Sequence, residues 1–212
     1  MTFVKVMIML IFTGHIICGI CHCLMTFSKT GLLDFSITRD NYKMSYVLGG
    51  MPRGTITTAL ILGSFAILAS TAGYIGFSTW MLQYNPGLSR AMVNLGTAIG
   101  IFGVIQHVVF GSCEWFYIRS GCTENARKLA FDFCKRLIFA SIIYVLALFA
   151  FSLILFIVIV TGMIQMPRWT CIFNPILFVT VLMLVNHFLP KKGAGIAQFA
   201  IGLAYVGLFL FI

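Results

Sequence analysis

Charged residues are scarce in this sequence, and few of them are acidic. Only 9% of the 212 residues are Asp, Glu, Lys or Arg, and five of those are Asp or Glu. Soluble domains carry about 25% charged residues, so the composition argues against a water-soluble globular domain. With 60% hydrophobic residues and a mean hydropathy of +1.04, the long uncharged runs require lipid around them. Backbone groups in hydrocarbon must bond within their own segment, which predicts helices.

Common catalytic motifs are also missing. The sequence has no P-loop, no glycine-rich dinucleotide fingerprint, no G-x-S-x-G elbow and no H-E-x-x-H helix. The seven cysteines are an odd number, mostly within apolar runs, so they do not indicate a disulfide framework, and the Cys21-x-Cys23 pair is no C-x-x-C redox motif. No A-x-A-like site follows the first apolar run, which favours a retained span over a cleaved signal peptide. We therefore expect no cofactor and no ATP-driven activity.

Six apolar runs are long enough to cross about 30 Å of hydrocarbon, which takes about 20 helical residues. The sequence thus predicts an all-α polytopic transmembrane helix bundle with six spans, forming a single domain over residues 1–212. The predicted spans are 3–27, 55–81, 91–117, 137–163, 169–189 and 194–212.

The basic residues are distributed unevenly among the connections. Eleven of the fourteen fall in 28–54, 118–136 and 190–193, and only three lie on the other side. Short cytoplasmic loops are rich in Lys and Arg, so these connections should be cytoplasmic and both termini non-cytoplasmic. The net charge of +9 then indicates contact with anionic lipid headgroups and not with nucleic acid. We expect a multi-pass protein of a cell membrane, with a bacterial inner membrane as the favoured location and lipids as partners.

The two long cytoplasmic connections have different patterns. In 118–136, charges of alternating sign stand four residues apart at Glu124, Lys128, Asp132 and Arg136, a spacing that supports an exposed helix leading into the fourth span. The connection 28–54 is too apolar for a free loop. We expect it to lie on the membrane surface or to re-enter partly beneath the helices.

Small residues mark two predicted contact faces, because helices in lipid approach closely where side chains are small. A channel lining is the alternative interpretation of the same pattern. These residues are Gly63, Ala66, Ser70 and Gly73 in the second span, and Gly96, Gly100 and Gly103 in the third. In the fifth span, Asn174-Pro175 predicts a kink, since proline frees a backbone carbonyl that Asn174 or a neighbouring helix can use.

Ionisable residues inside spans are costly and mark candidate functional sites. The first span has His15 and His22, and the third has His107 and Glu114. Each pair is seven residues apart, so its members share one helix face. Both spans run towards the cytoplasm, which places His22 and Glu114 about 10 Å deeper than their partners.

These residues suggest a cytoplasm-facing cavity where imidazole and carboxylate could perform acid–base chemistry on a lipid or hydrophobic small molecule. Glu114 would be the base or cation stabiliser and His107 the proton donor. The alternative is that these groups satisfy one another and hold the bundle in register. The predicted site residues are His107 and Glu114 as catalytic groups, with His15, His22, Arg53, Thr57, Asn174 and His187 as binding groups.

A metal site is a second hypothesis for the first span. His15, Cys18 and His22 fall at i, i+3 and i+7, and His and Cys suit zinc or copper. The spacing matches no established ligand pattern, and free cysteines are common in buried apolar positions. We therefore include no metal ligand among the predicted site residues.

Two resemblances bear on the fold. The segments 44–54 (MSYVLGGMPRG) and 166–175 (MPRWTCIFNP), with the glycine-rich span from Gly193, resemble small six-helix bacterial membrane proteins of unknown function. This resemblance implies a fold and no mechanism. A fainter similarity is to sterol isomerases of the emopamil-binding type, which also place His and Glu on a span beside an aromatic pair, as in His107 to Glu114-Trp115-Phe116. Their His–Glu spacing is shorter.

The sequence therefore favours a protein that binds or modifies a lipid or hydrophobic small molecule at an intramembrane cavity. A small transporter or permease-like protein is the first alternative, and it would need a polar path across the whole membrane. A non-catalytic membrane subunit is the second, and it would have an exposed small-residue groove and no cavity.

Overall fold

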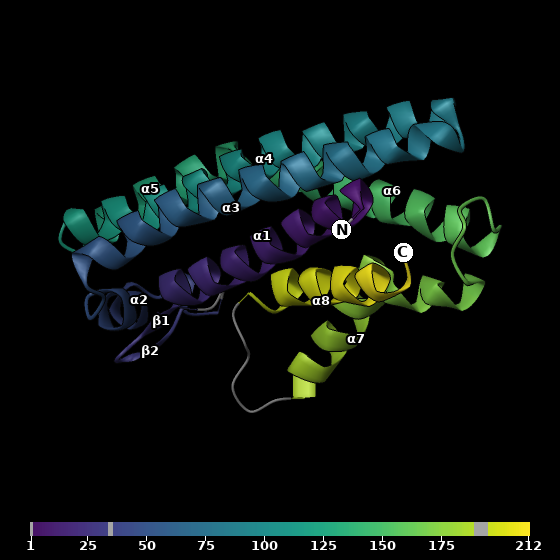
Figure 1. Cartoon of the computed structure of the whole chain (residues 1–212). Coiled ribbons are helices and arrows are strands. Elements are labelled where there is room, and N and C mark those ends of the chain that lie inside the picture. The colour runs from purple at the N-terminus through teal and green to yellow at the C-terminus, as the bar shows by residue number, and fades with distance from the viewer. Residues whose placement is uncertain (1, 34–35, 189–194) are drawn as a thin grey trace.

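The computed structural model describes residues 2–33, 36–188 and 195–212, and of Arg53 it describes the backbone alone. This part of the chain is helical apart from one hairpin of two-residue strands (Figure 1). The elements in chain order are α1 (Phe3–Thr26), β1 (Phe27–Ser28), β2 (Gly31–Leu32), the 3-10 turn η1 (Ile37–Arg39), α2 (Asn41–Leu48), α3 (Arg53–Trp80), η2 (Met81–Gln83), α4 (Pro86–Arg119), α5 (Glu124–Arg136), α6 (Ile138–Val160), η3 (Arg168–Phe173), α7 (Pro175–Phe188) and α8 (Ile196–Phe211).

Four of these helices, α1, α3, α4 and α6, are long and apolar enough to cross a membrane. They have 24, 28, 34 and 23 residues. The helices α7 and α8 are apolar but shorter, with 14 and 16 residues. At 1.5 Å per residue they measure about 21 and 24 Å, less than the ~30 Å of hydrocarbon. The count of six spans and the side of each terminus therefore stay predictions.

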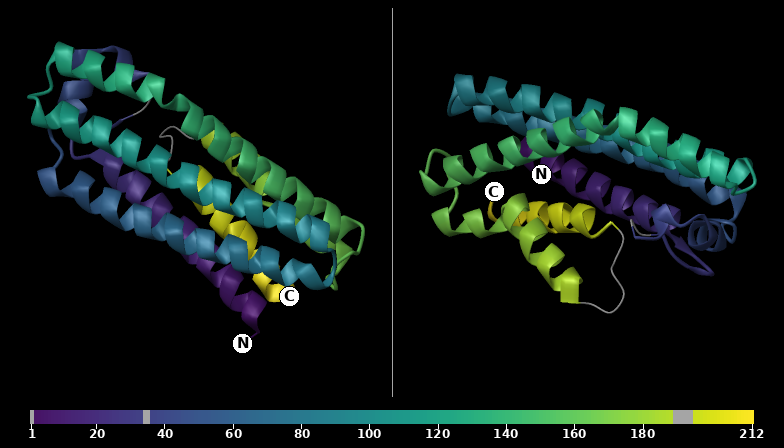
Figure 2. Two further views of the ribbon diagram at one scale, coloured as in Figure 1. Left: turned by 90° about the horizontal axis from the view of Figure 1, so that it is seen from above. Right: turned by 180° about the vertical axis from the view of Figure 1, so that it is seen from behind.

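The long helices form the body of the molecule (Figure 1). α3 lies along α4, α1 packs on α3, and α8 packs on α1, while α6 runs along α4 (Figure 2). Small residues make these contacts close, as the sequence predicts: a Cβ atom at Gly100 would overlap Thr71 of α3, and one at Gly14 would overlap Ser70. The termini lie near each other, where the Lys5 ammonium sits 5.3 Å from the centre of the Phe209 ring.

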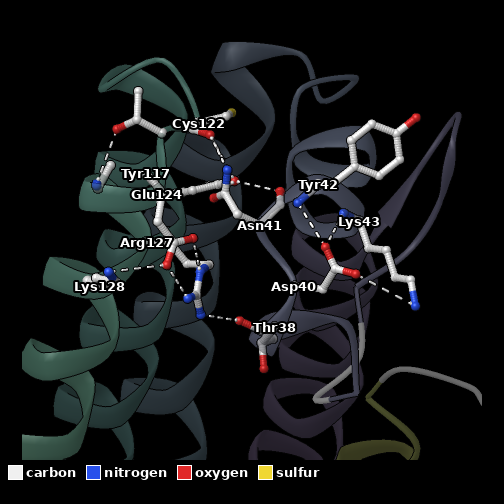
Figure 3. Close-up of polar contacts among 12 residues, drawn as sticks. Thr38, Asp40, Asn41, Tyr42, Lys43, Tyr117, Cys122, Glu124, Arg127 and Lys128 are labelled. Carbon is white, nitrogen blue, oxygen red and sulfur yellow. Dashed lines mark hydrogen bonds and ion pairs between the residues drawn. The ribbon is translucent and has the colours of Figure 1, made fainter.

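One end of the bundle carries a cap made of the hairpin, η1 and α2, which packs against α4 and α5. Met44 and Leu48 of α2 are buried with Tyr117 near the end of α4. Tyr117 donates its hydroxyl to Asn41 Oδ1 at 2.9 Å, and Arg127 of α5 donates to the Thr38 carbonyl at 3.0 Å (Figure 3). The described residues of the connection 28–54 therefore pack as a cap against α4 and α5.

The helix predicted before the fourth span is present as α5, and Leu137 alone separates it from α6. The predicted pairs form: Glu124 lies 3.7 Å from Lys128, and Asp132 lies 2.8 Å from Arg136. Glu124 makes a closer ion pair with Arg127, at 2.6 Å. The four-residue spacing of the alternating charges does not predict this pair.

The fifth apolar run differs from its prediction. Instead of one kinked helix over 169–189, residues Arg168–Phe173 form a 3-10 helix and α7 begins at Pro175. Proline suits the first helical position because its missing N–H would have no partner there. Asn174 stands directly before it, and its Oδ1 accepts the N–H of Ile176 at 3.0 Å. The Asn-Pro pair is thus a helix start and not a kink.

Candidate ligand cavity

A cavity of about 820 Å³ lies between the cap and the helix bundle. Residues from α1, α3, α4, α5, α6, α8 and the cap line it, and most of them are apolar. The lining residues are Cys18, His22, Met25, Thr26, Leu33, Thr38, Met44, Ile67, Gly103, Gln106, His107, Phe110, Cys113, Glu114, Ala130, Phe131, Cys134, Lys135, Ile138 and Gln198.

One face of α4 supplies the largest share of this wall. Residues three or four positions apart on a helix share a face, and the α4 lining residues follow that spacing from Gly103 to Glu114. Three buried polar atoms on this face have no hydrogen-bond partner among the described residues: Oε1 of Gln106, Nδ1 of His107 and Oε2 of Glu114. Buried polar groups in proteins are nearly always hydrogen-bonded, so three such atoms at one cavity indicate a polar ligand or water there.

His107 is fixed in place by α3. The side chain is 3% exposed, and Nε2 lies 3.0 Å from the carbonyl oxygen of Ala59. The ring fits here because Gly63 lacks a side chain, and a Cβ at that position would overlap Nε2. On the other side, the His107 ring stacks on His22 of α1, with centroids 5.6 Å apart and planes 19° apart.

His107 and Glu114 both line the cavity, and they are not adjacent, as their spacing on α4 requires. Seven residues of helix separate them by about 10 Å along the axis. Lys135 of α5 adds a cation to the same cavity, and its side chain is exposed. Gln106 and Lys135 were not predicted as site residues. Gln106 could have been found from its position one residue before His107, whereas Lys135 depends on how α5 folds back.

His15 has a different environment from the one predicted. Its Nδ1 lies 2.5 Å from Gln198 Oε1, and its Nε2 lies 2.8 Å from the Tyr74 hydroxyl. Gln198 continues this network by donating to Tyr144 at 3.2 Å. Both ring nitrogens of His15 are therefore engaged, and the residue is absent from the cavity lining. Its partners tie α1, α3, α6 and α8 together.

The other predicted binding residues are dispersed. Thr57 and His187 have exposed side chains, and neither lines the cavity. Asn174 is buried and donates to the Ser152 carbonyl at 2.8 Å, which links α7 to α6. The side chain of Arg53 and the connection 190–193 lie outside the described residues. The structure thus brings together His22, His107 and Glu114 from the predicted set.

Three residues at the cavity could hold a metal ion. One ligand atom from each of Cys18, His22 and His107 lies within 4.8 Å of the others. Two of them belong to the trio predicted on α1, and His107 takes the place of His15. The sequence could not show that His107, and not His15, lies beside Cys18 and His22. That depends on which faces α1 and α4 turn towards each other.

Comparisons with known proteins add a family and no activity. No curated protein matches the chain, and no solved structure matches it. The similarity to sterol isomerases therefore has no support, whereas the resemblance to a family of unknown function is confirmed. The model of one family covers residues 1–212, and the chain belongs to this family of unknown function, DUF6796.

Proposed function

We propose that the protein binds a lipid or a hydrophobic small molecule with a polar group in the cavity beneath the cap. The observation that carries this proposal is the pairing of a largely apolar wall with unpartnered buried atoms on Gln106, His107 and Glu114. Ligand sites combine these two properties, and their volumes fall between about 300 and 1,000 Å³. At about 820 Å³, this cavity is within that range.

The mouth of the cavity favours a ligand that comes from the membrane. Two lining residues at the junction of α5 and α6 are exposed, namely Lys135 and Ile138, and Ile138 is 49% exposed. Ile138 begins a helix that is apolar enough to cross the membrane, and the Lys135 ammonium stands three residues before it. A lipid tail could pass Ile138 while Lys135 contacts an anionic headgroup, as Lys does at membrane interfaces.

Chemical modification of the ligand is an extension of this proposal. His107 and Glu114 could each exchange a proton with a different position of one ligand, because about 10 Å of helix separates them. Nε2 of His107 donates to the Ala59 carbonyl, so His107 would take up the proton at Nδ1. They could not act on the same atom from fixed positions. His107→Ala and Glu114→Gln should abolish turnover of the bound compound while the protein stays folded.

The transporter alternative has less support. The ionisable side chains that line the cavity lie towards the cap, and towards the other end of the bundle the apolar core includes Ile8, Phe77 and Phe151. All three are 0% exposed. A permease-like path would need polar groups across this region.

The test is to identify and then displace the ligand. Protein purified in mild detergent should carry a lipid or apolar compound that mass spectrometry detects after extraction. Ile67→Trp places a larger side chain in the cavity wall and should reduce the bound compound at least several-fold. The control is Leu68→Trp, the next residue on α3, which is 53% exposed and does not line the cavity. Equal amounts of bound compound in the two variants would contradict the proposal.

A further inference from the structure

The group formed by Cys18, His22 and His107 has a chemistry that ligand binding does not require. Cys18 and His22 are four residues apart on α1, so they share one helix face. His107 belongs to α4. Its side chain passes over Gly63 of α3 and so comes close to Cys18 and His22. The three residues offer one thiol and two imidazoles, with one ligand atom from each within 4.8 Å of the others.

His107 has the hydrogen-bond arrangement of a metal ligand. A carbonyl oxygen only accepts, so the 3.0 Å contact with Ala59 requires Nε2 to carry the proton. The lone pair is then on Nδ1, which is buried and has no hydrogen-bond partner in the described part of the chain. Histidines that bind metals almost always donate their other ring N–H to a carbonyl or carboxylate. The Ala59 carbonyl would serve as that partner.

We propose that Cys18, His22 and His107 bind a zinc ion, with its fourth position open to the cavity. Thiolate and imidazole suit zinc, whereas calcium and magnesium prefer oxygen ligands. Three protein ligands and one open position are the arrangement of zinc sites that bind a further molecule. Zinc bond lengths of 2.0–2.3 Å place ligand atoms about 3.3–3.6 Å apart, so these side chains need to close by about 1 Å.

This site does not depend on the proposed lipid. Zinc content and bound lipid are measured separately, so either proposal can fail while the other stands. The zinc would sit on the cavity wall at His107, which is seven residues before Glu114 on α4. Its open position could accept a headgroup oxygen or water.

Metal analysis of the purified protein tests the proposal. Wild-type protein prepared without a metal-affinity step should contain about one equivalent of zinc, since structural affinities for such donors are high at neutral pH. Cobalt(II) added to the metal-free protein should produce a thiolate-to-cobalt charge-transfer band. Neither measurement depends on whether a variant folds. Zinc below about 0.1 equivalent together with no cobalt band, or copper in place of zinc, would overturn the proposal.

Variants then assign the ligands. Cys18→Ser and His107→Ala should each lower bound zinc about tenfold or more and remove the cobalt band, because each removes one of three ligands. Two controls carry the same residue types away from the group. Cys171→Ser alters a cysteine of η3, and His187→Ala alters an exposed histidine of α7. Both should keep zinc, and retention of zinc by Cys18→Ser would also overturn the proposal.

Discussion

At the scale of single residues, Gly63 controls the position of His107. A Cβ atom there would overlap Nε2 of the imidazole and push it away from the Ala59 carbonyl. Overpacking of this kind costs about 1–3 kcal/mol. We expect Gly63→Ala to lower the thermal unfolding midpoint in detergent. The control is Gly54→Ala on the same helix, where a Cβ would meet no atom within 4 Å. Equal midpoints for the two variants would show that His107 is not confined as described.

Asn174 is a residue whose role the structure changes. The sequence suggests a binding residue, but the side chain donates to Ser152 and caps the start of α7. Asn174→Ala removes the hydrogen bond to the Ser152 carbonyl and the cap of α7, at a cost of about 0.5–2 kcal/mol. We expect lower thermal stability with an unchanged amount of bound lipid per folded protein. Thr79→Ala is the control, since the exposed Thr79 hydroxyl bonds only to its own helix at Ile75. If folded Asn174→Ala protein carried less lipid than wild type, Asn174 would be a binding residue after all.

At the scale of elements, an ion pair within α5 positions Arg127, which contacts the cap, and acid should weaken this pair. Hydrogen bonds from Arg127 lower the pKa of the Glu124 carboxyl below its usual value. Because the pKa is lower in the folded state, the pair stabilises the protein above the unfolded-state pKa, near 4.3. That contribution is lost as pH falls through the folded-state pKa. Arg127 also donates to Thr38, so the pair orients the link between α5 and the cap (Figure 3).

The prediction is a pH-dependent difference between wild type and Glu124→Gln. At pH 7 the wild-type protein should have the higher unfolding midpoint in detergent, and the difference should shrink as pH falls below about 4. The pair is partly exposed, so salt should reduce the difference as well. A difference that stays constant from neutral to acid pH would contradict the assigned pair.

The elements also show how far sequence reasoning reaches. The ranges of α1, α3, α4 and α6 follow from composition, because lipid requires continuous apolar helices and charged connections end them. The face of α4 that carries His107 and Glu114 follows from helical spacing. The partners of these groups could not be predicted, because one helix pattern does not specify how helices rotate against each other. The connection 28–54 was expected only to lie on the membrane surface or to re-enter partly beneath the helices, since its short elements depend on contacts such as Tyr117 with Asn41.

At the scale of the whole molecule, the number of spans depends on α7 and α8. Two arrangements are compared, with α1, α3, α4 and α6 crossing the membrane in each: α7 and α8 both cross, or both turn back within the membrane. In both cases Ile212 lies on the same side as the start of α1, so its position does not discriminate. The position of the segment between α7 and α8 does discriminate. With six spans this segment faces the cytoplasm. With four spans it faces the opposite side or lies within the membrane.

We expect six spans. At 2.0 and 1.5 Å per residue, η3 is about 12 Å long and α7 about 21 Å, and the two meet at an angle at Asn174 (Figure 2). Neither reaches ~30 Å alone, so the expectation depends on the residues at the two ends. Trp169, near the start of η3, is 51% exposed, as interfacial tryptophans are. Lys191 and Lys192 at the far end favour the cytoplasm by the same bias that orients the other basic connections.

An epitope inserted between Lys191 and Lys192 tests this arrangement. It should bind antibody only after the membrane is permeabilised, like a control insertion after Gly121, which lies in the turn between α4 and α5. A second control after Gln83, between α3 and α4, should be accessible in unpermeabilised cells from which any outer barrier has been removed. If the epitope between the lysines behaves like the one after Gln83, α7 and α8 form a re-entrant pair. The bundle would then cross the membrane four times, and the two lysines would be an exception to the charge bias.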